Sequence, residues 1–352
     1  MKKIIIVFAL LVAVIVLAWW LNAMLAPKAP EIMEKEPLVI GFSLGTTREE
    51  RWFSDRDLFI KRAEELGAAV SVALSDYNVP LQISQIQNLI SQGVKVIVVI
   101  PSDSEKIAPI IEEAHQAGVR IIAYDRLIKD ANVDLYLSFD NVKVGQLEAQ
   151  SILDLKSEGD FAYIGGAPTD NNAFLLRTGS MSVLDPKIRS GEINLVVNQL
   201  MEGWKPDEAY KTIKNYLATG QTLDAVIAAN DGTAFGAIQA LKEKGLAGIV
   251  PVSGQDAELS ACQRIVDGTQ ASTVYKPIKL LAYRAAEIAV AMASGQEPEV
   301  NSTIDNGKVQ VLSYFLEPIL VTKENMLSTI IKDGFHTYEE VYRSQPPIEY
   351  AE

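Results

Sequence analysis

Several short apolar segments of this sequence are followed directly by side chains that can bind polar groups. These side chains are Arg51, Trp52, Asp125, Arg126, Asp170, Asn172, Trp204, Asn230, Asp256 and Lys276. Asp, Asn and Arg carry several donors or acceptors in one plane, so one side chain can bind two adjacent hydroxyl groups of a ligand. A tryptophan ring can cover an apolar C–H face of the same ligand. This combination favours a polyhydroxylated ligand such as a sugar.

The formal charges of the candidate side chains cancel. Three carboxylates stand against three cations, namely Asp125, Asp170 and Asp256 against Arg51, Arg126 and Lys276. An anionic ligand would not need three carboxylates, whereas a neutral polar ligand fits the balance.

Each candidate also has a purely structural alternative. Asp or Asn directly after a strand is often the N-cap of the next helix. We interpret Asp231, which precedes Gly232-Thr233, as such a cap and leave it outside the candidate site. Trp52 and Trp204 could instead belong to the hydrophobic core, and Arg126 could pair with a carboxylate on the surface. The site prediction therefore depends on the joint occurrence of these residues at strand ends.

The elements that must position these residues alternate between strands and helices. In the first half we expect strands at 38–42, 70–74, 94–100 and 119–124. The expected helices between them are 52–66, 81–92 and 104–117, each followed by a glycine that can adopt the left-handed conformation of a helix C-terminus. The near-continuous Val and Ile of the strands is typical of a parallel sheet covered on both faces.

The same alternation begins again in the second half of the chain. We expect strands at 161–165, 194–197, 225–229 and 250–254, and helices at 142–155, 207–217, 233–242 and 257–267. The predicted fold class is therefore α/β, with two doubly wound parallel-sheet lobes in succession. Ligands of such folds bind outside the carboxyl ends of the strands, where the candidate residues lie in the sequence.

Composition excludes several classes of function. The chain has 352 residues, which favours two domains, and a net charge of −13, so a general nucleic-acid binder is not expected. One cysteine, Cys262, allows neither an intrachain disulfide nor a Cys-rich zinc site, and the two histidines make most metal sites hard to build. We expect no cofactor and no metal.

The N-terminal segment predicts export across a membrane. Lys2-Lys3 precedes an apolar run of 18 residues, Ile4 to Leu21, which ends near Trp19-Trp20. Residues 1–26 could be a cleaved signal or a retained anchor. We favour the anchor because the run is long and the sequence at 22–26 does not form a clean cleavage motif. Residues 27–36 then form a tether, and the body lies outside the cytoplasmic membrane.

Six motifs give this chain a resemblance to a known family. They are Arg51-Trp52 with Asp55-Arg56-Asp57, Ala123-Tyr124-Asp125-Arg126, Ser138-Phe139-Asp140-Asn141, Asp170-Asn171-Asn172-Ala173, Gly254-Gln255-Asp256-Ala257 and Val274-Tyr275-Lys276-Pro277. Over about 37–335, the chain resembles the D-xylose-binding family of periplasmic sugar-binding proteins, which serve ABC importers and are related to ribose- and multiple-sugar-binding proteins. The resemblance implies that all ten candidates contact the sugar. It also implies a type I periplasmic binding protein, with two lobes that close about a hinge.

The resemblance and the sheet pattern together predict where the lobes divide. The N-terminal lobe is expected at 37–139 plus 276–303, the C-terminal lobe at 140–275 plus 304–335, and a loose tail at 336–352.

The predicted function is that of a non-enzymatic receptor that binds D-xylose and delivers it to an ABC permease. A multiple-sugar (glucose or galactose) binding protein and a receptor for a membrane sensor kinase are alternatives. A glycosidase or isomerase could use Asp125 and Asp170 as an acid–base pair, but nearby arginines should keep both ionised. A sugar-responsive repressor would need a basic DNA-binding segment where the N-terminal run is apolar.

Overall fold

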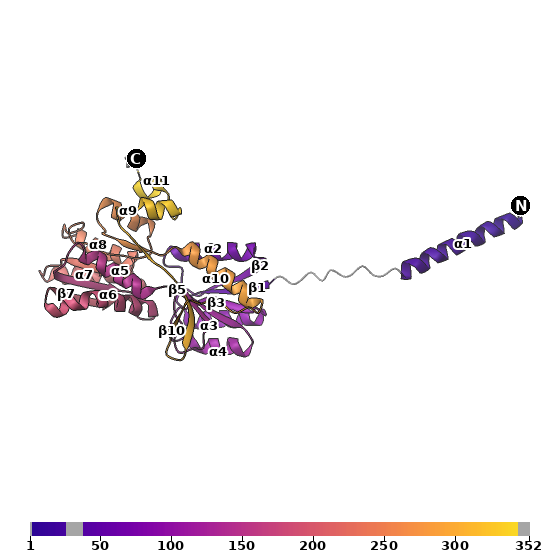
Figure 1. The fold of residues 1–352 in the computed structure, drawn as a ribbon, viewed down its shortest axis with the longest axis horizontal. Coiled ribbons are helices and arrows are strands. Elements are labelled where there is room, and N and C mark those ends of the chain that lie inside the picture. The colour runs from indigo at the N-terminus through magenta and orange to yellow at the C-terminus, as the bar shows by residue number, and fades with distance from the viewer. Residues whose placement is uncertain (1, 26–37, 344–352) are drawn as a thin grey trace. The chain divides into compact units, whose positions relative to one another are not determined.

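The computed structural model describes residues 2–25 and 38–343 (Figure 1). It contains two separate units, one of residues 1–37 and one of residues 38–352. The predicted tether at 27–36 lies outside the described residues.

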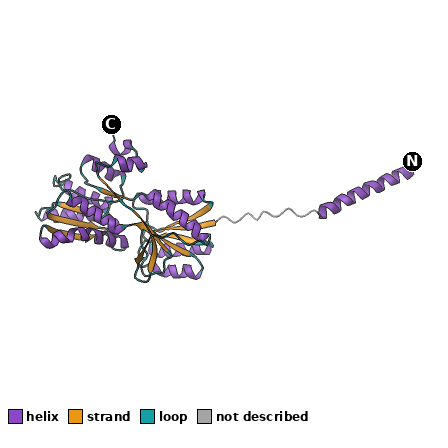
Figure 2. Cartoon of the chain, in the orientation of Figure 1, coloured by secondary structure: helices purple, strands orange, loops and turns teal. Residues whose placement is uncertain are grey.

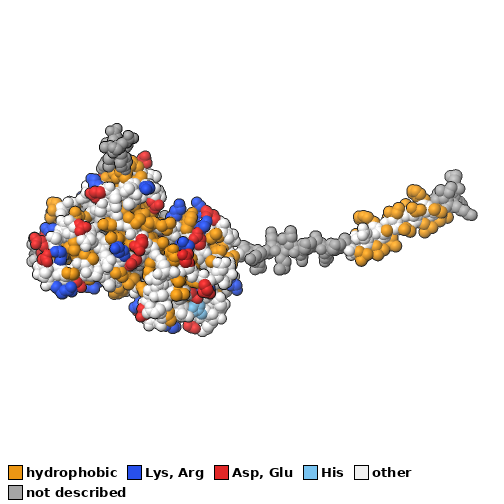
Figure 3. Space-filling model, in the orientation of Figure 1, with side chains coloured by type: hydrophobic (Ala, Val, Ile, Leu, Met, Phe, Trp, Pro, Cys, Tyr) orange, Lys and Arg blue, Asp and Glu red, His pale blue; other side chains and the backbone are white. Residues whose placement is uncertain are grey.

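The first unit contains one long apolar helix, α1 (Lys2–Leu25). Its segment Ile6–Leu25 has a mean hydropathy of 2.5 and is long and apolar enough to cross a membrane, a test that an export signal also passes. Between Ile6 and Leu25, exposed hydrophobic side chains line the surface of this helix that Figure 3 shows in colour. The helix thus matches the apolar segment predicted from the sequence.

The larger unit begins with a seven-stranded sheet in the order β10-β11-β5-β4-β3-β1-β2. Its strands are β1 (Leu38–Leu44), β2 (Ala68–Leu74), β3 (Val96–Ile100), β4 (Arg120–Tyr124), β5 (Leu135–Phe139), β10 (Ser302–Asp305) and β11 (Gln310–Leu316). The pairs are parallel except for β10 with β11. Four helices accompany this sheet: α2 (Arg51–Glu65), α3 (Val79–Ser91), α4 (Ala108–Gln116) and α10 (Ile278–Ala293).

Both faces of this sheet are buried, which explains its continuous apolar strands. In β3, Val96, Val98 and Ile100 face one core with α2 and α10, while Ile97 and Val99 face the other core with α3 and α4. Helices on both faces of the sheet are visible in Figure 2.

A second sheet has the strand order β7-β6-β8. Its strands are β6 (Gly159–Gly165), β7 (Ile193–Leu200) and β8 (Ala225–Ala228), and Val252 adds a single parallel bridge to Val226. The accompanying helices are α5 (Asn141–Leu153), α6 (Asn171–Ser190), η1 (Glu202–Trp204), α7 (Pro206–Ala218), α8 (Asp231–Lys242) and α9 (Leu259–Asp267). We call the seven-stranded sheet with α2, α3, α4 and α10 the first lobe, and the three-stranded sheet with α5 to α9 the second lobe.

Three connections join the lobes. The chain passes from β5 to α5, returns from β9 (Thr273–Tyr275) to α10, and leaves the first sheet again between β11 and β12 (Ile319–Val321). Strands β9 and β12 pair with each other in an antiparallel ribbon. The first two crossings follow Phe139 and Tyr275.

The third crossing was predicted too early in the sequence. Residues 304–316 were assigned to the C-terminal lobe, but β11 pairs in parallel with β5, from Ser313 with Tyr136 to Leu316 with Phe139. Val311 is buried in the core of the first lobe. This strand extends the first sheet because β5 would otherwise leave an apolar edge unpaired.

The predicted loose tail was also wrong for its first part. After η2 (Leu327–Ile331), helix α11 (Tyr338–Tyr342) begins with a capping box at Thr337 and buries Val341 and Tyr342 in a core shared with α9. Residues 344–352 lie outside the described residues.

Candidate functional site

All ten candidate side chains line one cavity between the two lobes, together with Glu49 and Gln255. Each of the ten is at least nine-tenths buried. The first lobe contributes Arg51 and Trp52 from the start of α2, and Asp125 and Arg126 from the end of β4. The second lobe contributes five residues from the ends of its strands and the starts of its helices, namely Asp170, Asn172, Trp204, Asn230 and Asp256, while Lys276 lies at the crossing after β9. Whether the side chains bind a ligand remains a prediction.

A buried ion cluster connects the lobes at the centre of this cavity. The Arg51 guanidinium lies 2.9 Å from the Asp125 carboxylate in its own lobe and 3.4 Å from the Asp256 carboxylate in the other. The Lys276 Nζ lies 2.9 Å from Asp256 Oδ1 and 3.9 Å from Asp125 Oδ2. Asp55, one turn along α2, accepts a hydrogen bond of 3.0 Å from Arg51 Nε. We call Arg51, Asp125, Asp256 and Lys276 the central ion cluster.

A second ion pair crosses between the lobes beside it. Arg126 Nε lies 2.8 Å from Asp170 Oδ2, which also accepts a 3.2 Å hydrogen bond from Trp204 Nε1. Asp170 Oδ1 caps helix α6 by accepting from the backbone N–H of Asn172. The Asn172 amide nitrogen in turn donates to the Asp125 side chain over 3.2 Å.

Hydrogen bonds outside the lining of the cavity also join the lobes directly. The Ser104 N–H donates to the Thr169 carbonyl over 2.9 Å, and the Asn171 N–H donates to Ser104 Oγ over 3.1 Å. Arg48 donates from the first lobe to the Gly203 carbonyl of the second. With these contacts made, the cavity measures about 20 Å³, room for about one water molecule. A sugar can therefore enter only when the lobes or these side chains move apart.

The pKa values of Asp125 and Asp170 shift in opposite directions, although both carboxylates are buried and paired with cations. Burial raises the pKa of Asp125, but the charges of Arg51, Lys276 and Arg126 outweigh it, so that its pKa is lowered overall. At Asp170 burial outweighs the Arg126 charge, and the pKa is raised. The expectation that arginines leave no carboxyl with a raised pKa is therefore wrong for Asp170. Its oxygens nonetheless accept hydrogen bonds from three donors, an arrangement suited to binding.

Three site residues have left-handed backbone conformations that non-glycine residues seldom adopt. They are Asp125 (φ 61°), Trp204 (φ 57°) and Asp256 (φ 93°). Such conformations cost of the order of 1 kcal/mol each and persist where the surrounding structure imposes them. Here the left-handed backbone orients the carboxylates of Asp125 and Asp256 and the indole of Trp204 toward the same cavity.

The indole of Trp204 rests on a glycine. A Cβ atom at Gly166 would lie 2.0 Å from Cη2 of that ring, so only glycine fits beneath it. Trp52 lies under two guanidinium groups, with Arg51 Cζ 4.5 Å and Arg126 Cζ 5.3 Å from its ring centroid. Both tryptophans also belong to apolar core clusters. Each ring therefore packs in the hydrophobic core and lines the cavity at the same time.

The helix cap assigned to Asp231 is in fact Asn230. Asn230 Oδ1 accepts from the Thr233 N–H over 2.9 Å in a capping box, which leaves only its amide nitrogen available to a ligand. Asp231 is buried and accepts hydrogen bonds from Gln270 and Thr273, which fix the loop beside the site. Burial raises the pKa of Asp231 to about 7.

Sequence reasoning missed two cavity-lining residues, Glu49 and Gln255. Each has one buried side-chain oxygen, Oε1, with no hydrogen-bond partner within residues 2–25 and 38–343. Both flank predicted residues, Glu49 next to the Arg51 motif and Gln255 beside Asp256. Adjacency to the motifs was the available signal. No cluster of His, Cys, Asp or Glu within the described part of the chain could hold a metal ion.

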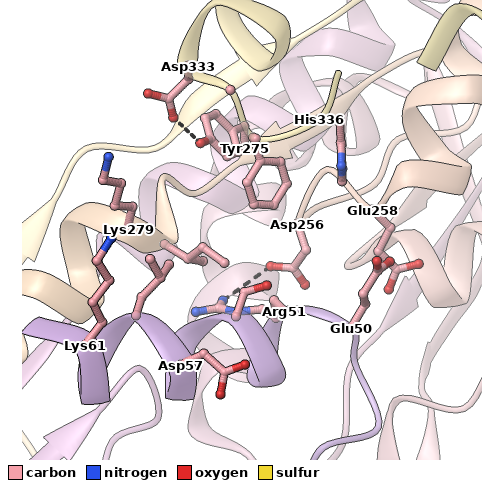
Figure 4. A pocket seen from close by; sticks show the side chains of 15 residues that line it. Glu50, Arg51, Asp57, Lys61, Asp256, Glu258, Tyr275, Lys279, Asp333 and His336 are labelled. Carbon is pink, nitrogen blue, oxygen red and sulfur yellow. Dashed lines mark hydrogen bonds and ion pairs between the residues drawn. The ribbon is translucent and has the colours of Figure 1, made fainter. Parts of the chain in front are cut away.

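A larger cleft of about 470 Å³ lies beside Arg51 and Asp256 of the central ion cluster (Figure 4). Arg51 and Asp256 form part of its wall, and Glu258 of the second lobe lies close to Glu50 of the first. The Tyr275 hydroxyl donates to Asp333 at its upper edge in this view. Apart from Arg51 and Asp256, which it shares with the central cavity, this cleft is lined by no arginine, asparagine or tryptophan among the described residues, so we place the candidate site in the smaller space.

The comparison with known proteins agrees with this two-lobed arrangement. Residues 40–297 match the family model described as periplasmic binding protein domain. The chain belongs to this family. The members are solute-binding proteins, so the enzyme alternative does not hold.

Two curated relatives and one solved structure illustrate the likeness. The D-xylose-binding periplasmic protein of Escherichia coli K12 is 49% identical over 303 residues, 86% of this chain and 92% of that protein. The multiple sugar-binding periplasmic receptor ChvE of Rhizobium radiobacter is 35% identical over 86% of this chain and 92% of its own. A carbohydrate transporter solute binding protein from Chloroflexus aurantiacus, solved in complex with D-glucose, superposes with a TM-score of 0.80 at 31% identity, covering 86% of this chain and 97% of that chain. The predicted type I fold is confirmed.

The side cleft leads to a prediction about pH and stability. Burial, followed by the charges of Asp231 and Asp256, raises the pKa of Glu258 from 4.5 to about 8, with Arg264 opposing and Glu50 adding to the rise. The folded protein therefore holds a proton that the unfolded chain releases between about pH 4.5 and 8, and stability should fall as pH rises through this window. Thermal unfolding measures the drop in melting temperature between pH 5 and pH 8.5. We expect this drop to be a few °C smaller in Glu258→Gln than in the parent, because glutamine does not titrate.

The exposed Glu64 provides the matched control for that measurement. Glu64→Gln should follow the parent profile. A Glu258→Gln profile that also overlays the parent would contradict the assignment.

Proposed function

We propose that this protein is an extracytoplasmic receptor that binds D-xylose between its two lobes and delivers it to an ABC permease. The observation that carries the proposal is the central cavity, where buried planar donors and acceptors from both lobes surround one small space. The 49% identity to a D-xylose-binding periplasmic protein over most of both chains supports this choice of sugar.

The chemistry of the cavity suits a neutral polyol. In the proposed complex, hydroxyl groups accept from Arg51, Arg126 and Lys276, and donate to the aspartates that these cations now bind directly. The remaining predicted ligands contribute amide and indole contacts, namely Asn172, Asn230, Trp52 and Trp204. An exchange of this kind preserves the pairing of every buried charge, because each hydroxyl both donates and accepts.

A multiple-sugar receptor is the second candidate. The relative of this name is 35% identical, and two solved structures with TM-scores of 0.80 hold glucose. Discrimination between a pentose and a hexose depends on whether the closed cavity leaves space for one more CH₂OH group.

We also propose that α1 remains in the membrane and anchors the receptor at its outer face. The length of the helix and the two tryptophans near its outer end support this proposal. An anchored receptor stays beside its membrane partner at a high effective concentration. An ABC permease is the preferred partner, and a membrane sensor kinase that reads the closed form is the alternative.

Calorimetric titration tests the choice of ligand. D-xylose should bind with a dissociation constant of roughly micromolar or better, and ribose, arabinose and glucose at least tenfold more weakly. The reason is that a wrong sugar leaves buried donors or acceptors of the cavity unpaired. Tighter binding of glucose than of xylose would favour the multiple-sugar receptor, and no binding of any of the four sugars would refute the proposed function.

The native N-terminus tests the anchor. Protein purified from membranes should retain α1 and require detergent for release, and the proteins that co-purify with xylose present should include permease subunits. A mature chain that begins near residue 26 or 27 would exclude the anchor. Recovery of a sensor kinase without a permease would favour the sensing role.

A further inference from the structure

Glu49 occupies an unusual position beside the central ion cluster. It precedes α2 by two residues, lines the same cavity as the ten predicted side chains and is only 8% exposed. Its Oε2 accepts a hydrogen bond from Trp52 Nε1 and lies 3.8 Å from Arg126 Nη2. Its Oε1 is buried and has no hydrogen-bond partner among the residues that the structure describes. A carboxylate with one buried, unpaired oxygen is costly, so a donor is expected in the working complex.

The neighbouring donors Trp52 and Arg126 do not reach Oε1 of Glu49. The indole of Trp52 has a single N–H, which Oε2 uses. Arg126 bonds Asp170 through Nε and the Tyr77 hydroxyl through Nη2. Because no donor among the described residues reaches Oε1, a ligand that fills the cavity can supply the missing donor.

The other carboxylates of the cavity differ from Glu49 in this respect. Asp125 is bound by Arg51 and Asn172, Asp170 by Arg126 and Trp204, and Asp256 by Arg51 and Lys276. Within 38–343, Glu49 is the carboxylate of this cavity that has a fully buried oxygen without a hydrogen-bond donor. Its Oε1 can therefore accept a hydrogen bond from a ligand without the exchange of an ion pair.

We infer that Glu49 is a further sugar-binding residue, whose Oε1 accepts a hydrogen bond from one hydroxyl group of the bound sugar. The inference rests on the proposed function and adds a determinant of specificity to it. A hydrogen bond to a buried carboxylate is stronger than one to a neutral acceptor. Glu49 therefore makes the cavity demand a hydroxyl at one ring position, next to Trp52 and Arg126, and reject sugars that lack it.

The test combines one variant with a set of sugars. Glu49→Gln keeps the shape of the side chain and an acceptor for Trp52, but removes the charge. Titration of the parent and of the variant with D-xylose and with its 1-, 2-, 3- and 4-deoxy analogues measures how strongly residue 49 is coupled to each hydroxyl group of the sugar. We expect Glu49→Gln to bind D-xylose about tenfold more weakly. For one of the four deoxy sugars, which lacks the hydroxyl that Glu49 binds, parent and variant should have equal affinity.

The neighbouring Glu50 supplies the matched control. It is exposed and lines the side cleft instead of the central cavity, so Glu50→Gln should bind every sugar within twofold of the parent. Melting temperatures establish that both variants are folded. If Glu49→Gln does not fold, Glu49→Asp, which retracts the carboxylate by one methylene group, gives the same test.

The possible outcomes separate the inference from the proposed function. An unchanged affinity of Glu49→Gln for D-xylose, or an equal loss for all five sugars, would overturn the role of Glu49 while the proposed function stands. A parent that binds none of the sugars would overturn the proposed function and this inference with it.

Discussion

The buried ion cluster between the lobes is the interaction on which the rest of this structure depends. Arg51 of the first lobe and Asp256 of the second are almost completely removed from water, and Lys276 lies at the crossing that connects the lobes. Burying charges costs several kcal/mol per ion, which direct pairing repays only with good geometry and additional hydrogen bonds. The contact of 3.4 Å between Arg51 and Asp256 is not of this quality. Closure around these side chains should therefore be favourable mainly when a ligand supplies further hydrogen bonds.

Each lobe holds its part of the cluster rigidly. The parallel strands end at a common edge, the helices begin there, and both faces of the strands are packed, so the polar residues at the strand ends have little freedom to move. The positions of these side chains are fixed further by the left-handed backbone at Asp125, Trp204 and Asp256. The packing of the Trp204 indole against Gly166 fixes the ring in the same way. We therefore expect any relative motion of the lobes to take place in the three crossings, as in hinge closure.

The sequence predicted what local chemistry determines. The runs of Val and Ile indicated the parallel strands because both faces are buried, and the side chains that follow them converge because parallel strands end at one edge. The sequence analysis assigned the helix cap to Asp231 instead of Asn230. Either side chain can accept a hydrogen bond from a backbone N–H in the first turn of a helix, and only the backbone geometry decides between them. Strand β11 and helix α11 were assigned wrongly because their partners, β5 and α9, are distant in the sequence. Glu49 was missed because its neighbours, not its own spacing, make it part of the cavity.

Small-angle scattering tests the central claim most directly. Residues 38–352, which form a compact unit by themselves, should show a smaller radius of gyration with saturating D-xylose than without it. The same unit carrying Asp256→Ala should contract much less at the same sugar concentration, because the second lobe then lacks its acceptor in the ion cluster. A radius that does not change when the parent binds D-xylose would contradict the account, since the lobes would then already be closed around an unfilled network of buried charges.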